Sequence, residues 1–297
     1  MKKIVKYWLP DSLQPYAQVA SRRTRTWGRR LDYFLDSRTL SQEEFINHLQ
    51  NLGIFPGATI YLHSSMDKLM RRVPSLNTFA CINLLKELLT DEGTLLVPTF
   101  PFLGSQYHYV QRQRLFNVQR TPSAVGLFTE LFRRTAGVTR SLHPTHPIAA
   151  WGRHSKELVA EHHLGTAFGK TSPVYKMQQY YGRVVGIGVM PRHCFTLFHM
   201  AEELHPCTRA MQYSSETLDM IIIHGQEKIP YRVTPLRPRS SNRVRNYGRA
   251  ERILRREGIL RYYRVKGLQL SVTLVCQFLQ KCQKLIDANL FYSHPRV

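Results

Sequence analysis

Apolar and polar positions follow a regular pattern from residue 41 onward. Ser41-Gln-Glu-Glu44 has the composition of a capping box, in which the Ser hydroxyl and the Glu carboxylate satisfy each other's backbone N–H groups. Phe45, Leu49 and Leu52 follow at helical spacing, and Gly53 ends the pattern. This segment therefore predicts an amphipathic helix at the start of the folded part of the chain.

Short apolar blocks then alternate with longer blocks of helical period. The predicted strands comprise residues 58–63, 94–97, 148–151 and 183–189. The predicted helices comprise residues 76–89, 122–132, a short stretch after Pro173, 195–204, 249–256 and 272–286, with a β-hairpin over 218–224 and 228–233 around Gly225. The helix over 76–89 is expected to direct Phe79, Ile82 and Leu85 inward, with Leu88 or Leu89. Strands that alternate with helices predict an α/β fold: a central, mostly parallel sheet flanked by helices, followed by a C-terminal hairpin and helices.

The chain divides most simply into a basic, aromatic extension over residues 1–40 and one domain over 41–297. The N-terminus lacks the apolar core of a signal peptide, and no apolar run approaches the roughly 20 residues that span a bilayer, so a cytoplasmic protein is expected. The five cysteines form no CxxC pair, which favours reduced thiols without a disulfide framework or a zinc site. A monomer or a homodimer is expected.

Basic residues outnumber acidic ones by 42 to 20, for a formal net charge of +22. This excess indicates an anionic partner, which could be a phosphorylated ligand, a membrane surface or a nucleic acid. The arginines gather in several clusters, at residues 22–30, 112–120, 237–245 and 249–264. A dedicated nucleic-acid binder more often concentrates its basic residues in one helix or tail, so none is predicted here. Two interpretations stay open: a functional anion-binding field and a merely solvated basic surface.

Several loops carry residues suited to an anion, at positions where α/β sheets place their ligands. Ser64 and Ser65 follow the first predicted strand, and Arg140 and Ser141 precede the strand at 148–151. Thr121 and Ser123 lie at a predicted helix start, where backbone N–H groups favour negative charge. Taken singly, the loop at Ser64 and Ser65 fits an ordinary turn better than an anion site, and Thr121 and Ser123 fit simple helix caps better.

One histidine has a context that suits acid–base chemistry. His199 and Glu202 are three residues apart on a predicted helix, so they share one helical face just after a sheet strand. The other histidines, including His143, His146 and the pair at 162–163, show no metal-ligand spacing, and no metal is predicted. The chain also lacks a GxSxG elbow, a Walker-type loop and a GxGxxG fingerprint.

Taken in order, seven motifs resemble the aminoglycoside 3-N-acetyltransferase family, also called the antibiotic N-acetyltransferases. They are LHSSM (62–66), GTLLVPTF (93–100), TPSAVG (121–126), RSLHPTHPIAAWG (140–152), FGKTSPVYKM (168–177), GRVVGIGV (182–189) and TLFHMAEE (196–203). Residues 248–267 are similar to the family's closing segment. No single motif is specific, and the resemblance rests on their order and spacing.

The resemblance implies a CoA-dependent acyltransferase, with acetyl-CoA as co-substrate and no metal. It places the catalytic base at His199 and the coenzyme A channel at Ser64, Ser65, Thr121, Ser123, Arg140 and Ser141. An amine or hydroxyl acceptor needs a base with a pKa near neutrality, which suits histidine. Direct transfer is the family expectation, so Cys194 is not expected to be a nucleophile although it is close in sequence. Glu202, Glu203 or a distant carboxylate would orient the base.

The sequence also departs from the pattern of the antibiotic-modifying members. Those members carry an acidic residue shortly after the PTF strand and another after the second hairpin strand, whereas this chain reads PFLGS at 101–105 and VTPLRPR at 233–239. A basic pocket repels a polycation, so the expected acceptor is a small sugar or amino sugar that is neutral or anionic. Two alternatives remain: a family member with impaired catalysis, and a basic protein that binds RNA or contacts a membrane surface peripherally.

Overall fold

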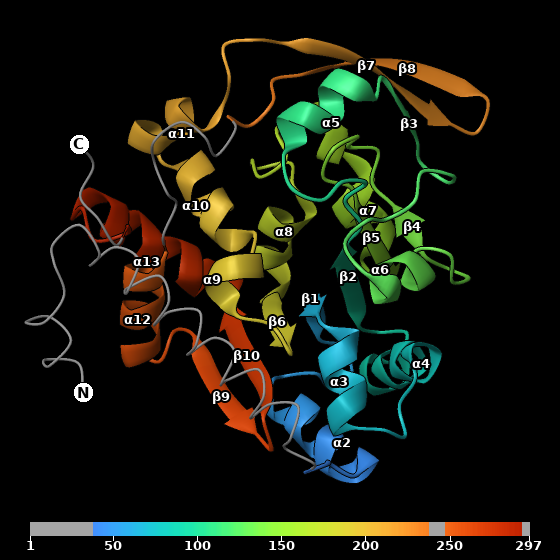
Figure 1. The fold of residues 1–297 in the computed structure, drawn as a ribbon, viewed down its shortest axis with the longest axis vertical. Helices are drawn as coiled ribbons and strands as arrows, with labels where there is room; N and C mark the ends of the chain where they lie inside the picture. Colours follow the sequence, from blue (N-terminus) through green and yellow to red (C-terminus); the bar gives the residue numbers. More distant parts are fainter. Residues whose placement is uncertain (1–37, 238–246, 293–297) are drawn as a thin grey trace, which may run out of the picture. The chain divides into compact units, whose positions relative to one another are not determined.

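The large sheet of the computed structural model has seven strands (Figure 1), and the structure describes residues 38–237 and 247–292. In spatial order the strands are β4 (Thr139–Arg140), β5 (Ile148–Gly152), β2 (Thr94–Pro98), β1 (Thr59–Ser64), β6 (Arg183–Ile187), β10 (Leu268–Leu274) and β9 (Arg261–Val265). Strands β2, β1 and β6 are parallel neighbours, and β4 and β9 run in the same direction, whereas β5 and β10 run opposite. The α/β class with a mostly parallel central sheet is therefore confirmed.

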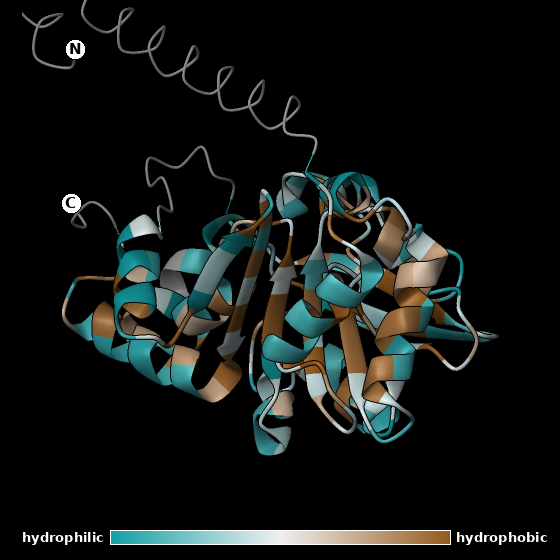
Figure 2. Ribbon diagram, turned by 90° about the horizontal axis from the view of Figure 1, so that it is seen from below, coloured by the Kyte–Doolittle hydropathy of each residue, from teal (hydrophilic) through white to brown (hydrophobic). Residues whose placement is uncertain are grey.

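Helices cover both faces of this sheet, and Figure 2 shows its apolar strands in brown between them. In chain order the helices are α2 (Gln42–Asn51), α3 (Met66–Arg72), α4 (Thr78–Leu89), α5 (Gln106–Arg112), α6 (Leu127–Phe132), α7 (Ser155–Ala160), α8 (Pro173–Lys176), α9 (Pro191–Cys194), α10 (Leu197–Leu204), α11 (Pro206–Gln212), α12 (Gly248–Arg256) and α13 (Val275–Asp287). Short 3₁₀ turns span His162–Leu164 and Met177–Tyr180. No helix in these described ranges is long and apolar enough to cross a membrane.

Strand β1 is buried on both faces, which explains why its sequence is mostly apolar. Ile60 and Leu62 pack into a core with α2, α3, α4 and α6, whereas Tyr61 between them packs into a second core with α10, α12 and α13. Successive side chains of a strand point to opposite faces, so a strand covered on both sides needs apolar residues at every position. The core thus lies in two layers around the sheet.

The predicted elements at the start of the chain are mostly confirmed. The capping box before α2 is present: Glu44 N–H donates to Ser41 Oγ at 3.0 Å, and Ser41 N–H donates to the Glu44 carboxylate at 2.8 Å. One assignment of an inward side chain was wrong, because Phe79 on α4 is 62% exposed. Ile82 and Leu85 are buried as predicted, and Leu89 rather than Leu88 completes the stripe.

The hairpin β7 (Leu218–His224) and β8 (Glu227–Val233) is confirmed, with Gly225 in the turn at φ +63°. It belongs to a separate three-stranded sheet in which β7 pairs with β3 (Leu115–Asn117). Phe116, Met220 and Ile222 form part of a small core of their own beneath it.

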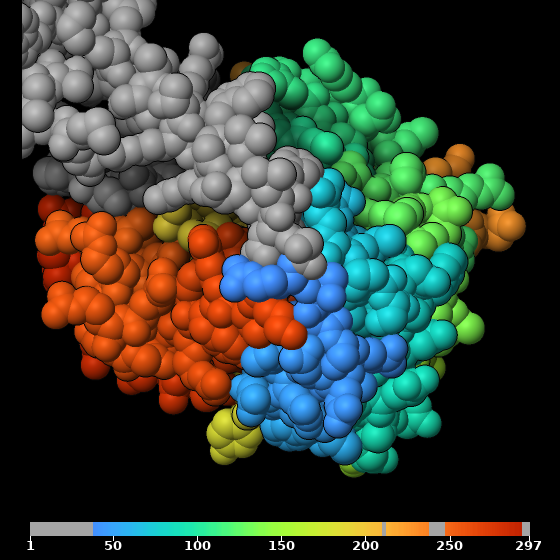
Figure 3. All heavy atoms as spheres, turned by 60° about the horizontal axis from the view of Figure 1, so that its bottom comes forward, coloured from blue at the N-terminus to red at the C-terminus, as the bar shows by residue number. Residues whose placement is uncertain are grey.

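The C-terminal helix prediction was wrong at its start. Residues 272–274 belong to strand β10, and helix α13 begins only at Val275. Strands β9 and β10 form a hairpin whose two turn residues, Lys266 and Gly267, both have positive φ, as a type I′ turn requires. Figure 3 shows this hairpin (orange) beside α2 (blue), where Lys266 Nζ pairs with the Glu44 carboxylate at 2.8 Å.

Residues 1–37 lie outside the described residues, so the N-terminal extension over 1–40 stays a prediction. From residue 40 onward the chain forms one compact unit, and the site described below lies within it.

Candidate active site

His199 lies on α10 with a quarter of its side chain exposed. Its Nδ1 is 3.5 Å from Glu202 Oε2 and 3.3 Å from the Tyr247 hydroxyl. The shared helical face predicted for His199 and Glu202 is therefore present. A carboxylate beside Nδ1 favours the tautomer with the proton on Nδ1, which leaves Nε2 as the basic nitrogen. The arrangement can accept a proton at Nε2 and stabilise the imidazolium that forms.

Glu202 is held in place by residues from the end of the chain. Its side chain is 2% exposed, and the Tyr292 hydroxyl donates to its Oε1 at 2.5 Å. Tyr247 approaches His199 from a different segment, edge to face with the imidazole. Sequence reasoning missed both tyrosines, since nothing in the spacing of positions 199, 247 and 292 links them.

Aromatic rings extend from His199 along one side of the site. Phe168 stacks on the imidazole with ring centroids 5.3 Å apart, and His146 lies edge-on to Phe168 at 4.8 Å. Phe100 and Phe102, from the loop after β2, contact His146 at 4.7 and 5.5 Å. The loop that lacks an acidic residue thus brings aromatic rings to this side of the site.

Three histidines are buried beside these rings, and His146 is one of them. His143 and His146 are close in the loop before β5, and His162 lies beside them with its Nδ1 2.9 Å from Ser141 Oγ. Burial lowers the pKa of His162 to about 4, and burial with neighbouring histidines holds the pKa values of His143 and His146 well below the usual range. All three are neutral near pH 7, so they act as packed hydrogen-bonding groups.

Ser64 and Ser65 lie where predicted, at the carboxyl end of β1 beside the end of β6. Ser65 N–H donates to Ile187 O at 2.9 Å, and Gly188 packs so tightly that a Cβ there would lie 3.3 Å from Ser65 Cβ and 3.1 Å from Lys68 Cβ. Lys68 adds a cation to this edge and donates to the Gln269 side chain at 3.3 Å. Because the side chains at this edge are small, an elongated ligand would be able to approach the backbone closely.

Arg140 comes to the same edge because β4 runs parallel to β2. Its guanidinium is buried and donates to Thr99 Oγ1, Thr99 O, Val118 O and Thr121 O. Ser141 is also buried, where its hydroxyl contacts His162 and accepts from Ile148 N–H. Both side chains are engaged with the protein and fix the loops around the site. Their contact with coenzyme A stays a prediction.

The loop with Thr121 and Ser123 precedes its helix, which begins at Leu127 and not at Pro122 as predicted. Thr121 Oγ1 accepts from Asn117 N–H at 2.9 Å. Ser123 N–H donates to the Glu130 carboxylate at 2.7 Å, and the Ser123 hydroxyl contacts Thr129 Oγ1. These bonds close the loop on itself, and a role in binding coenzyme A remains to be tested for both residues.

Two other candidates can be placed. Burial raises the pKa of the Cys194 thiol, whose Sγ donates to Met190 O at 3.2 Å, so a reactive thiolate is disfavoured. Glu203 points away from His199: it accepts from Thr166 Oγ1 at 2.9 Å and pairs with Arg209 at 3.4 Å. Of the two adjacent glutamates, Glu202 is the one beside the imidazole.

The family model described as aminoglycoside 3-N-acetyltransferase matches residues 61–286. The chain belongs to the aminoglycoside 3-N-acetyltransferase family. Membership confirms the predictions of a CoA-dependent acyltransferase and of acetyl-CoA as co-substrate.

Relatives of this family member are distant in sequence. It is 27% identical over 204 residues to the SPbeta prophage-derived aminoglycoside N(3')-acetyltransferase-like protein YokD of Bacillus subtilis (strain 168). This match spans 63% of this chain and 72% of YokD. It is 28% identical over 185 residues to aminoglycoside N(3)-acetyltransferase VII of Streptomyces paromomycinus, and the match spans 57% of this chain and 63% of that protein.

Solved structures share the fold of this family member. AAC-IIIb, whose structure is a binary complex with CoASH, has a TM-score of 0.69 at 18% identity, over 86% of this chain and all of that chain. The structure of YokD has a TM-score of 0.66 at 22% identity, over 81% of this chain and 91% of that chain. At these identities the likeness establishes the architecture alone.

Proposed function

We propose that this family member transfers the acetyl group of acetyl-CoA directly to an amine or a hydroxyl of a small sugar-like acceptor, with His199 as general base and Glu202 as its positioning residue. The observation that carries the proposal is the Nδ1 contact of His199 with the buried Glu202 carboxylate, which leaves Nε2 as the proton acceptor. Relatives named as aminoglycoside N(3)-acetyltransferases support an amine as the nucleophile.

The chemistry needs one proton relay. The acceptor nitrogen or oxygen attacks the thioester carbonyl and loses a proton to Nε2 of His199, and a tetrahedral oxyanion forms. When the C–S bond breaks, the imidazolium returns the proton to the CoA thiolate. The Glu202 carboxylate balances the transient positive charge.

For the acceptor, we propose a neutral or anionic amino sugar in place of a polycation. Structures in the family carry sisomicin and apramycin. In this chain the loop after β2 lines its side of the site with Phe100 and Phe102, which suit stacking against a sugar ring or a nucleobase. The segment after β8 carries Arg237, which would repel a polycation.

The test is thiol release from acetyl-CoA against a panel of amino sugars, nucleotide-linked sugars and aminoglycosides. The variant His199→Ala should lose about 10²–10⁴-fold in kcat, while acetyl-CoA still raises the melting temperature of both proteins by mass action. Equal turnover in the variant would exclude His199 as the base. A micromolar KM for a kanamycin-type drug would exclude the proposed acceptor class.

The same panel separates the remaining alternatives. A protein that is stabilised by acetyl-CoA but releases no thiol with any acceptor would be the catalytically impaired member. A protein that is not stabilised by acetyl-CoA, and whose affinity for RNA or anionic vesicles rises steeply as the salt concentration falls, would be the surface-binding protein.

A further inference from the structure

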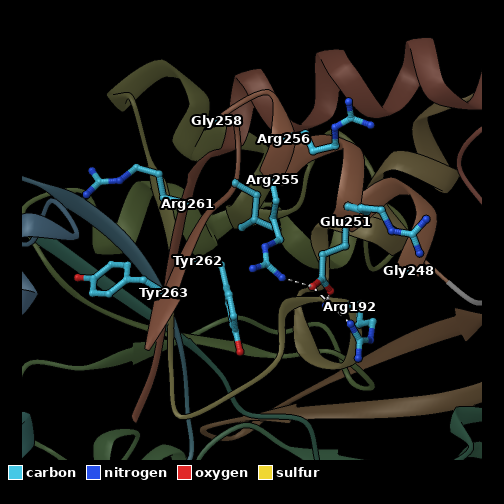
Figure 4. Close-up of a pocket in the computed structure, with 11 residues that line it drawn as sticks. Arg192, Gly248, Glu251, Arg255, Arg256, Gly258, Arg261, Tyr262 and Tyr263 are labelled. Carbon is cyan, nitrogen blue, oxygen red and sulfur yellow. Dashed lines mark hydrogen bonds and ion pairs between the residues drawn. The ribbon is translucent and has the colours of Figure 1, made fainter. Parts of the chain in front are cut away.

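A groove rich in arginine lies apart from the residues assigned to catalysis (Figure 4). It has a volume of about 960 Å³ and lies between α9, α12 and the edge strand β9. Five guanidinium groups line it against a single carboxylate, contributed by Arg192, Arg252, Arg255, Arg256, Arg261 and Glu251. The C-terminal arginine cluster of the sequence is thus gathered around one concavity.

The single carboxylate organises part of this charge. Glu251 is 2% exposed, accepts from Arg192 N–H at 3.1 Å, and lies 3.5 Å from the Arg192 guanidinium and 3.7 Å from that of Arg255. Figure 4 shows both arginines directed toward it. Arg255 in turn lies over the ring of Tyr262 at 4.2 Å. A buried anion therefore fixes two guanidinium groups at the groove, which lowers the entropy cost of binding a ligand there.

The guanidinium groups of the other three arginines are not paired with a carboxylate among the described residues, so they can bind an anionic ligand. In the described part of the chain no carboxylate pairs with Arg252, Arg256 or Arg261, and all three are exposed. Several unpaired guanidinium groups around a concavity are costly in mutual repulsion, and an anion relieves this cost. Guanidinium groups bind phosphate through paired N–H donors, which makes phosphate the matching anion.

The groove is also connected to the reaction edge of the sheet. Arg264 on β9 donates to the Tyr262 hydroxyl at 3.4 Å and is the register partner of Gln269, which accepts from Lys68 just after Ser64 and Ser65. On its other side, Gly248 of the groove follows Tyr247, which contacts His199.

We infer that this groove binds the phosphate groups of a nucleotide-type ligand. The volume is that of a small-molecule site, and Tyr262 and Tyr263 offer ring surface beside the arginines. The phosphates could come from coenzyme A itself or from a phosphorylated acceptor such as a nucleotide-linked sugar. The inference concerns binding alone and does not depend on the role proposed for His199.

The experiment is calorimetric titration with adenosine 3′,5′-bisphosphate, CoA, 3′-dephospho-CoA and uridine diphosphate. The groove variant Arg256→Gln/Arg261→Gln should bind at least one of these about 100-fold more weakly, at about tenfold per lost guanidinium. A matched control, Arg112→Gln/Lys156→Gln, removes two exposed charges from other elements and should change affinity by less than about threefold. Equal melting temperatures of the two variants would show that both are folded.

The arms of the titration identify the source of the phosphate. A loss seen with CoA but not with 3′-dephospho-CoA assigns the groove to the 3′-phosphate of coenzyme A, and a loss confined to uridine diphosphate assigns it to the acceptor. Equal weakening in groove and control variants would overturn the inference in favour of diffuse surface charge. So would wild-type protein that binds none of the mononucleotides but binds a single-stranded RNA through these arginines.

Discussion

The surroundings of His199 and the arginine groove handle charge in opposite ways. Around His199, one buried carboxylate and two tyrosine hydroxyls support a single titratable group, and the neighbouring histidines are kept neutral by burial. In the groove, five guanidinium groups gather around one carboxylate. The first region is governed by hydrogen-bond geometry in a site of low polarity, and the second by long-range attraction. The two should therefore respond differently to substitution, to salt and to pH.

The largest effect is expected at the carboxylate beside the base. Glu202→Gln keeps the shape but removes the charge that stabilises the imidazolium, so kcat should fall about 100-fold with little change in the affinity for acetyl-CoA. Steady-state thiol release measures kcat, and calorimetry measures the affinity. As a control, Glu203→Gln should reduce kcat far less, because Glu203 faces Thr166 and Arg209. If Glu203→Gln is the more damaging change, the assignment of the positioning carboxylate is reversed.

The second-largest effect is expected from salt, which should weaken binding in the groove but leave kcat at His199 nearly unchanged. Raising ionic strength from about 0.05 to about 0.5 M shortens the Debye length roughly threefold, and affinity for adenosine 3′,5′-bisphosphate should drop on the order of tenfold. The kcat at saturating acetyl-CoA and a neutral acceptor should stay within about twofold, because the buried pair of His199 and Glu202 is poorly screened. Comparable salt sensitivity of both quantities would mean that the regions are not distinct electrostatically.

A third expectation concerns stability against pH. Burial lowers the pKa of His63 to about 3 and that of His162 to about 4, from ordinary values near 6.5. Below pH 6.5 the unfolded chain takes up protons that the native state excludes, so the free energy of unfolding should decrease as pH falls from about 6.5 toward 4. Each such group contributes at most about 1.4 kcal/mol per pH unit.

Denaturant unfolding at a series of pH values tests this expectation. His63→Leu suits the comparison, because His63 stacks on Phe195 in apolar surroundings and its Nε2 lacks a partner among the described residues. The variant should lose less stability than the wild type over the same pH interval. A wild-type curve that is flat from pH 6.5 to 4 would contradict the buried neutral state.

The smallest effect is expected at Tyr292, which contacts Glu202 and acts on His199 only through that carboxylate. Tyr292→Phe removes the hydroxyl that donates to Glu202 at 2.5 Å and should reduce kcat about three- to tenfold. The pH profile of kcat should shift, since the carboxylate that orients His199 is then less well fixed. A purely structural role would lower the melting temperature and leave the pH profile in place.

The sequence sufficed for four of the seven strands of the large sheet and for the pair on α10. The apolar blocks predicted β1, β2, β5 and β6 to within a residue or two, because strands buried on both faces are uniformly apolar. Helical spacing alone placed His199 beside Glu202. The β9–β10 hairpin was missed, although Lys266-Gly267 has the composition of a tight turn and the apolar residues of 268–274 alternate with polar ones, as in a strand.

What could not be predicted depends on contacts between distant segments. Arg140 has the residue type of a phosphate ligand, yet it lies buried among four protein acceptors that come from two other loops. Tyr247 and Tyr292 reach the site only after α12 and α13 have packed against the sheet. Local pattern carries no information about such partners, which explains why the acid–base pair was found and the tyrosines were not.

The position of β10 in the sheet has a consequence for synthesis on the ribosome. It is the last strand to be made, yet it lies between β6 and β9, and β6 is one of the central parallel strands. Until residues 268–274 emerge, β6 has an unpaired edge that is open to pairing with other nascent chains. The same delay withholds Tyr292 from Glu202, so a chain stalled or cleaved before residue 268 should be both aggregation-prone and inactive.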